Sequence, residues 1–341
     1  MQPRYRERNC FMNIGICVAC NDRYAAHAAA LIVSIRKHRN DDEEHVFYVL
    51  SDRLSEENRR NFAGMEQTFG CTIRIIDVDD SVFARWPAWR RSYAAYLRLA
   101  MGRVLPKDVS KILYLDCDMI VRTSLAPLWK TDLADNYGAA AAEGNAAAKT
   151  FSYLNLKGLY FNSGMILFNL DKYREDGLEE NILRRGGEMA GKLSFPDQDL
   201  LNEAFHGKTI FVPYRWNVNY CREAREHFER IGFFSIYTEE QIREETNSPC
   251  IVHFGGEKPW LMSCFHPHRK LYWDCQRETP FYADACRGYW RSFPKLLKFL
   301  AKELVSFRVT KKRTYLKLFG WTVYNSHPKF IPSVETQDET Q

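Results

Sequence analysis

The sequence lacks long apolar runs and an apolar leader. No stretch reaches the roughly 18 consecutive apolar residues that a membrane-spanning helix needs, and the first residues, MQPRYRERNCF, carry charges but no apolar segment typical of a secretory signal. The ten cysteines are scattered apart from Cys17 and Cys20. This pair lies in the apolar run IGICVAC, which predicts a buried strand and not a redox or zinc motif. We therefore expect a cytoplasmic protein with reduced thiols.

The sequence also lacks a strong charge of one sign. A formal net charge of +5 over 341 residues indicates no particular partner, and no nucleic-acid recognition motif accompanies it. We therefore expect no nucleic-acid partner. With 45% hydrophobic residues, the chain can bury the core of one large domain with an appendage, or of two modest domains.

Strand-like and helix-like segments alternate along the first half of the chain. Apolar or β-branched runs predict strands at Ile14–Cys20, His45–Leu50, Thr72–Val78 and Lys111–Leu115. Helical patterns occupy Tyr24–His38, Ser55–Phe69 and Ala94–Val104. This alternation predicts an α/β fold with a mainly parallel central sheet and helices on both faces. The less regular second half predicts strands at Tyr137–Ala142, Leu159–Asn169 and Ile251–Phe254, and helices at Leu178–Leu193 and Asp197–Phe205.

Two carboxylates follow the strand predicted at Lys111–Leu115. Asp116 and Asp118 flank Cys117 at the carboxyl end of that strand, which is where ligands bind in open α/β sheets. Carboxylate oxygens suit Mg²⁺ or Mn²⁺, and such an ion suits a diphosphate. A solvated acidic turn would have the same sequence, so this motif is weak on its own.

A second candidate motif is His253-Phe254-Gly255-Gly256-Glu257-Lys258-Pro259-Trp260. The imidazole of His253 could be a third ligand for Mn²⁺, glycines allow backbone to approach phosphate, and Lys258 could neutralise a leaving diphosphate. The alternative is a core histidine followed by an ordinary turn.

A third candidate is Asp197-Gln198-Asp199, at the start of a predicted helix. These polar side chains could bind sugar hydroxyls. The alternative is a plain helix N-terminus with acidic residues in its first turn.

Together these motifs resemble glycosyltransferase family 8, which includes bacterial lipopolysaccharide glucosyl- and galactosyltransferases and, more distantly, glycogenin. The likeness runs in order from about Asn13 to about Trp260. Besides the three motifs above, it includes Tyr96-Leu97-Arg98-Leu99, Leu125-Ala126-Pro127-Leu128-Trp129 and Phe161-Asn162-Ser163-Gly164. Several motifs in the right order are more specific than any one of them.

The resemblance implies a GT-A fold, with a nucleotide-binding half at 13–135 and an acceptor and donor-sugar half at 136–290. It implies that Asp116, Asp118 and His253 hold Mn²⁺, or else Mg²⁺. The implied contacts with the donor are Ala19, Asn21 and Tyr24 at the uracil and ribose, Cys117 in the metal motif, Arg98, Gly256 and Lys258 near the phosphates, and Glu143, Asn162, Ser163, Asp197 and Gln198 around the transferred sugar.

Two departures from the family pattern affect the donor contacts. The family's usual motif is HxxGxxKPW, where x is any residue; here one residue instead of two separates Gly256 from Lys258, so this loop is one residue shorter. The turn after the first strand reads Asn21-Asp22-Arg23, where many relatives carry two acidic residues. Neither change touches the implied metal ligands.

The composition changes near the C-terminus. Residues 291–333 predict a basic, amphipathic helical extension, and 334–341 a disordered polar tail. A basic segment with interleaved large apolar residues can lie at an anionic membrane surface, so we expect peripheral membrane contact. The alternative is a helix docked on the main domain with a solvated basic face.

The resulting hypothesis is a retaining, metal-dependent transfer of glucose or galactose from a UDP-hexose to a saccharide acceptor, such as lipopolysaccharide core or another lipid-linked glycan. Gln198 and Asp197 are the expected catalytic residues, with Gln198 stabilising a cationic sugar ring during front-face attack because an amide is a poor nucleophile. The alternatives are a non-catalytic, membrane-associated UDP-sugar-binding protein and a glycogenin-like protein that glucosylates itself.

Overall fold

The computed structural model describes residues 11–83, 86, 93–145, 154, 156–219, 229, 232–309, 314–318 and 321–326, with side chains described up to residue 300. The chain divides into two compact units. The first comprises Met1–Pro259 and Cys264–Cys286, and the second comprises Trp260–Ser263 and Arg287–Gln341.

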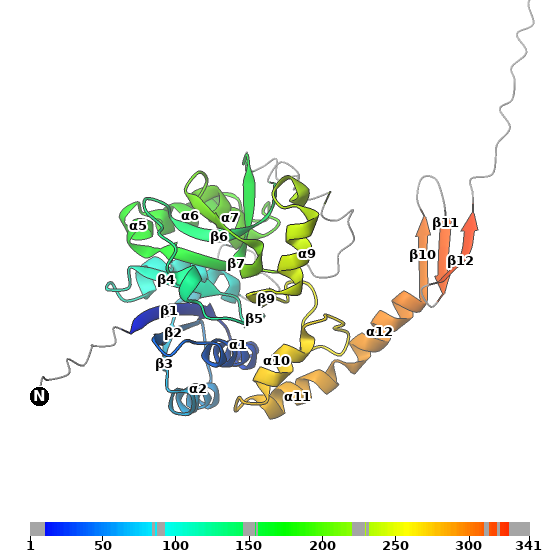
Figure 1. Cartoon of the computed structure of the whole chain (residues 1–341), viewed down its shortest axis with the longest axis horizontal. Coiled ribbons are helices and arrows are strands. Elements are labelled where there is room, and N and C mark those ends of the chain that lie inside the picture. The colour runs from blue at the N-terminus through cyan, green and yellow to red at the C-terminus, as the bar shows by residue number, and fades with distance from the viewer. Residues whose placement is uncertain are drawn as a thin grey trace, which may run out of the picture. The chain divides into compact units, whose positions relative to one another are not determined.

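A seven-stranded sheet forms the centre of the first unit (Figure 1). Its strands, in spatial order, are β3 (Thr72–Asp77), β2 (Glu43–Ser51), β1 (Met12–Ala19), β4 (Lys111–Leu115), β7 (Leu159–Asn169), β6 (Gly138–Asn145) and β8 (Thr209–Val212). Strand β7 pairs antiparallel with β4 and β6, whereas the other pairings are parallel. The predicted mainly parallel α/β sheet is therefore confirmed. A separate antiparallel pair consists of β5 (Met119–Val121) and β9 (Ile251–His253).

Helices follow most strands, as the alternating pattern predicts. Within the described residues, the α-helices of this unit are α1 (Ala25–Lys37), α2 (Glu56–Phe69), α3 (Met101–Val104), α4 (Ala126–Trp129), α5 (Leu170–Glu175), α6 (Leu178–Glu188), α7 (Pro196–Ala204), α9 (Glu239–Asn247) and α10 (Arg269–Gln276), and α11 (Tyr282–Arg291) begins in it. Helix α2 shows how local sequence sets the ends: the Ser55 hydroxyl accepts from the Asn58 N–H at its start, and Gly70 ends it with a φ of 56°. The segment predicted as a helix from Ala94 is instead a 3₁₀ helix, η2 (Ala94–Ala100), that continues into α3.

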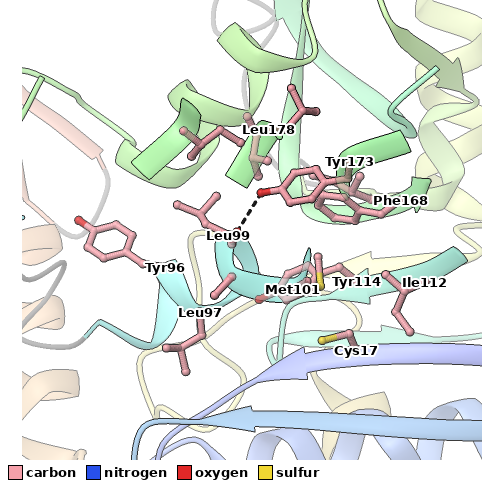
Figure 2. Packing of buried hydrophobic residues seen from close by; sticks show 14 of the residues in the cluster. Cys17, Tyr96, Leu97, Leu99, Met101, Ile112, Tyr114, Phe168, Tyr173 and Leu178 are labelled. Carbon is pink, nitrogen blue, oxygen red and sulfur yellow. Dashed lines mark hydrogen bonds between the residues drawn. The ribbon is translucent and has the colours of Figure 1, made fainter. Parts of the chain in front are cut away.

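Both faces of the central sheet are buried. In β1, Cys17 points into a cluster with Tyr114, Phe168 and Tyr173, while the alternate residue Ile16 is equally buried. Figure 2 shows this cluster, with the Tyr173 hydroxyl donating a hydrogen bond of 2.8 Å to the Leu99 carbonyl. Strands covered on both faces read as continuous apolar runs, which explains why IGICVAC does not alternate.

The second unit has its own secondary structure. Helix α12 (Phe293–Leu304) is followed by three antiparallel strands, β10 (Val305–Val309), β11 (Thr314–Leu318) and β12 (Trp321–Ser326). The prediction of a helical extension is therefore right for α12 and wrong for the residues after it. Apolar and polar residues alternate with a period of two over Val305–Val309, a pattern that favours a strand over a helix. The predicted tail at 334–341 lies outside the described residues. Among the described residues, no helix is both long and apolar enough to cross a membrane.

Candidate functional site

A cavity of about 440 Å³ opens at the carboxyl ends of β1 and β4. Every residue that the family resemblance assigned to the site lines it. Asp199, predicted with Asp197 and Gln198 as a side chain that could bind sugar hydroxyls, does not line it; its carboxylate is fully buried and accepts from the backbone N–H groups of Ser194 and Phe195 at the start of α7. The lining residues are Ala19, Asn21, Tyr24, Ala94, Ala95, Arg98, Tyr114, Asp116, Cys117, Asp118, Glu143, Asn162, Ser163, Phe195, Asp197, Gln198, Asn219, His253, Gly255, Gly256 and Lys258. These residues come from segments distant in sequence, and the sheet topology brings them together.

Two carboxylates and an imidazole converge at one end of the cavity. Asp116 follows β4, Asp118 precedes β5, and His253 ends β9, where it pairs with Met119. The His253 Nε2 atom lies 3.4 Å from Asp118 Oδ1 and 3.8 Å from Asp116 Oδ2. One ligand atom from each residue lies within 4.8 Å of the other two, a spacing that can hold one cation.

The surroundings of this triad fit a divalent cation. The His253 Nδ1–H donates to Asn217 Oδ1 at 2.9 Å, which leaves the Nε2 lone pair directed at the carboxylates. A Cβ added at Gly164 would lie 2.6 Å from His253 Cε1 and 2.9 Å from Asp116 Oδ2, so only glycine leaves room for these ligands. Carboxylate oxygens suit both Mn²⁺ and Mg²⁺, whereas the imidazole favours a transition metal such as Mn²⁺.

Arg98 is buried behind Asp116. Its guanidinium donates to Asp116 Oδ1 at 2.7 Å and to the Ser163 carbonyl at 2.8 Å, and lies 3.3 Å from Asp197 Oδ2. Tyr114 supports the same carboxylate, because its hydroxyl donates to Asp116 Oδ1 at 3.0 Å and its ring lies under the guanidinium. Arg98 therefore positions carboxylates of the cavity wall and neutralises their charge.

Lys258 reaches the other aspartate. Its ammonium pairs with Asp118 Oδ2 and donates to the carbonyls of Phe254 and Gly255 at 2.8 and 3.1 Å. Burial alone would raise the pKa of Asp118, but the Lys258 ammonium beside it holds that pKa well below its usual range. Asp118 is therefore anionic and ready to bind a cation. The shortened loop still places Lys258 in the cavity.

Amide and carboxylate side chains form a wall beside the triad. Gln198 Oε1 accepts from Asn162 Nδ2 at 3.1 Å and from the Ser163 N–H at 3.0 Å, while Gln198 Nε2 donates to Glu143 Oε2 at 2.9 Å. The Ser163 hydroxyl donates to Asp197 Oδ2 at 3.1 Å. Burial raises the pKa of Asp197, although Arg98 opposes the shift. This wall is a rigid, polar surface of the kind that binds hydroxyl groups.

The first-strand turn provides the remaining wall. The Cys117 thiol donates to the Ala19 carbonyl at 3.2 Å, and the Asn21 side chain accepts from the Arg23 N–H at 3.1 Å. Tyr24 is 37% exposed and packs edge-on against His27. An exposed aromatic ring beside small and polar groups offers a stacking surface for a planar base.

Several site residues escaped the sequence analysis. Tyr114, Phe195 and Asn219 line the cavity, and Asn217 supports His253 from behind. Nothing in a single sequence distinguishes these four residues from ordinary core or surface residues. The one available signal is the position of Tyr114: it lies on β4, two residues before Asp116, and residues two apart along a strand point to the same side of the sheet.

The described residues that line the cavity carry an excess of negative charge. Four carboxylates line it, those of Asp116, Asp118, Glu143 and Asp197, against the two cations of Arg98 and Lys258. The formal net charge of these side chains is therefore −2, which one divalent cation would neutralise.

The sequence profile of glycosyl transferase family 8 matches residues 15–264. The chain belongs to glycosyltransferase family 8. It is 27% identical to general stress protein A of Bacillus subtilis (strain 168) over 75% of this chain and 90% of that protein. It is also 27% identical to a lipopolysaccharide 1,2-glucosyltransferase of Escherichia coli over 70% of this chain and 71% of that protein.

Solved structures agree with this assignment. The crystal structure of the galactosyltransferase LgtC in complex with donor and acceptor sugar analogs is 30% identical, with a TM-score of 0.66 over 78% of this chain and 96% of that chain. The apo structure of the bifunctional glycosyltransferase WbbM, 21% identical, shares the fold with a TM-score of 0.69 over 85% of this chain and 53% of that chain. The family 8 protein described here therefore has the GT-A fold and is a hexosyltransferase.

Proposed function

We propose that this glycosyltransferase transfers glucose or galactose from a UDP-hexose to a saccharide acceptor, with retention of configuration and dependence on Mn²⁺ or Mg²⁺. The observation that carries the proposal is the convergence of Asp116, Asp118 and His253 in a cavity that is also lined by the Gln198 amide network. A cation held by the triad would stabilise the charge that develops on the departing diphosphate.

The protein's own groups prepare the rest of the site. Lys258 adds positive charge beside Asp118, where the leaving group would lie. The Gln198 amide oxygen, fixed by two N–H donors, would face the sugar ring as positive charge develops on it. Asp197 adds a buried carboxyl on the same wall, held by Ser163 and Arg98.

The hydrogen bonds of the cavity favour front-face transfer. Each cavity carboxylate already has a cation or an amide as its partner: Asp116 and Asp197 pair with Arg98, Asp118 with Lys258, and Glu143 with Gln198. None of these pairings favours a protein carboxylate as the base that takes the acceptor proton. In our proposal, an oxygen of the departing phosphate takes this proton.

Release of UDP tests the proposal. Purified protein is incubated with a panel of UDP-sugars and Mn²⁺, with and without chelator, as wild type and as Asp118→Asn. The matched control is Asp171→Asn, at an aspartate of α5 whose side chain is exposed. The proposal would be supported if the wild type hydrolyses one donor, if the chelator and Asp118→Asn each abolish this hydrolysis, and if Asp171→Asn leaves it unchanged. Binding of a UDP-sugar without turnover, even with saccharide acceptors, would favour the non-catalytic alternative. Hexose added to the protein itself, detected by mass spectrometry, would favour the self-glucosylating one.

A lipid-linked acceptor is the form of the proposal that the second unit supports. On α12, Phe293, Leu297 and Leu300 are spaced for one helical face and are 47%, 52% and 38% exposed. Lys295 and Lys298 accompany them. Such a helix suits the surface of an anionic membrane. Truncation after residue 292 should abolish salt-sensitive binding to vesicles containing phosphatidylglycerol; unchanged binding would remove the membrane from the proposal.

A further inference from the structure

Asn217 is a buried amide that links His253 of the triad to Asn162 of the Gln198 network without lining the cavity. The residue follows η3 (Tyr214–Trp216) and is 1% exposed. The next residue, Val218, exchanges backbone hydrogen bonds with β9, where the His253 N–H donates to its carbonyl at 2.9 Å. The backbone beside Asn217 is therefore fixed relative to His253.

The oxygen of this amide selects the form of the histidine. Asn217 Oδ1 accepts from His253 Nδ1 at 2.9 Å, so a neutral imidazole must carry its proton on Nδ1 to make this bond. Nε2 then presents a lone pair to Asp116 and Asp118, which lie 3.8 and 3.4 Å away. The other tautomer would place an N–H where a cation needs a ligand.

The nitrogen of the same amide acts on the Gln198 network. Asn217 Nδ2 donates to Asn162 Oδ1 at 3.0 Å, Asn162 Nδ2 donates to Gln198 Oε1 at 3.1 Å, and Gln198 Nε2 donates to Glu143 Oε2 at 2.9 Å. All donors point the same way from His253 to Glu143. A hydrogen-bonded chain of this kind polarises cooperatively and fixes the orientation of every amide in it.

We propose that Asn217 is a positioning residue with two separable tasks: its oxygen holds His253 in the metal-binding tautomer, and its nitrogen orients Asn162 and Gln198 in the sugar-binding wall. This inference rests on the proposed metal-dependent transfer of a hexose. A carboxylate could perform the first task but not the second, and an aliphatic side chain could perform neither.

The variants Asn217→Asp and Asn217→Leu separate the tasks. Mn²⁺ affinity is measured by electron paramagnetic resonance, the His253 tautomer by ¹⁵N chemical shifts of histidine-labelled protein, and UDP-sugar hydrolysis by steady-state kinetics. Asn136→Leu, at an amide that bonds the Leu133 carbonyl and does not line the cavity, is the control for substitution of an asparagine. Thermal melts show which variants are folded.

For Asn217→Leu we expect Mn²⁺ affinity to fall by about 10- to 100-fold, as for other partners of metal-bound histidines, with loss of the single-tautomer signature. For Asn217→Asp we expect the signature and Mn²⁺ affinity to be retained, while kcat/KM for the UDP-sugar falls by about tenfold or more because the donor to Asn162 is lost. The retained affinity distinguishes a positioning role from a merely structural one.

Three outcomes would overturn the inference. Wild-type Mn²⁺ affinity in a folded Asn217→Leu protein would refute the first task, and so would an Asn217→Asp protein that loses the metal as Leu does. Unchanged sugar kinetics in Asn217→Asp would refute the second. Failure of the wild type itself to bind Mn²⁺ would instead refute the metal in the proposed function, so the two failures are distinguishable.

Discussion

Gly164→Ala should disable the metal site without unfolding the protein. The new Cβ would lie 2.6 Å from His253 Cε1 and 2.9 Å from Asp116 Oδ2, whereas carbon atoms pack at about 3.5–4.0 Å. The imidazole must therefore move by about 1 Å, and metal sites tolerate errors of about 0.2 Å in their ligand distances. Overpacking of this kind costs about 1–3 kcal/mol of the free energy of unfolding, which a domain of this size can absorb.

The measurement is the rise in melting temperature on addition of Mn²⁺, which reports binding to the folded state. We expect this rise in the wild type and its loss in a folded Gly164→Ala protein. Gly64→Ala, in α2, is the control, because a Cβ there meets nothing within 4 Å and the residue does not line the cavity; it should leave Mn²⁺ binding intact. An undiminished Mn²⁺ shift in Gly164→Ala would refute the reasoning, since it would show that the triad can move and still bind the ion.

Three further predictions concern other parts of the molecule. In α6, Gly187→Ala should raise the free energy of unfolding by about 0.5–1 kcal/mol, whereas Gly186→Ala should lower it by about 1–3 kcal/mol because its Cβ would lie 1.9 Å from the Trp86 ring; urea denaturation of both variants checks the opposite signs. Burial raises the pKa of Glu179 to about 7, so the free energy of unfolding should decrease as pH rises from about 4.5 to 7. Urea denaturation should then show that Glu179→Gln is more stable than the wild type by about 1–3 kcal/mol at pH 8 but not at pH 4. Lys258→Met should lower kcat for UDP-sugar hydrolysis by about 100-fold or more while retaining Mn²⁺ affinity; equal losses of both would show that Lys258 supports the metal ligands instead.

The sequence predicted the elements whose local signals agree with their surroundings. Ser55 and Gly70 mark the ends of α2 by side-chain and backbone chemistry that acts within a few residues. The apolar runs that become β1 and β4 are covered on both faces, so burial and local pattern coincide. The site residues were identified because they lie in contiguous motifs with recognisable order, such as Asp116-Cys117-Asp118.

The remaining features depend on contacts between distant segments. Asn217 supports His253 across 36 residues, and Asn162 is 55 residues from Asn217, so no local pattern marks them. Strand β7 runs antiparallel because of its neighbours in the sheet, and not because of any signal in its own residues. The strands after α12 are not predicted, because the basic, apolar-rich composition of this segment favours an amphipathic helix. The alternation of apolar and polar residues over Val305–Val309, which favours a strand, is a weaker signal.

The unequal charges of the cavity have a consequence for the order in which ligands arrive. With four carboxylates and two cations among its described lining residues, the cavity would repel a diphosphate, and a divalent ion would remove this repulsion by neutralising the excess. In the proposed function, the ion would therefore enter before the nucleotide or together with it. A rapid-mixing experiment would then show slow, weak nucleotide capture by metal-free protein and fast capture once the metal is in place. The same excess should retain the ion after the nucleotide leaves, so that one metal serves successive turnovers.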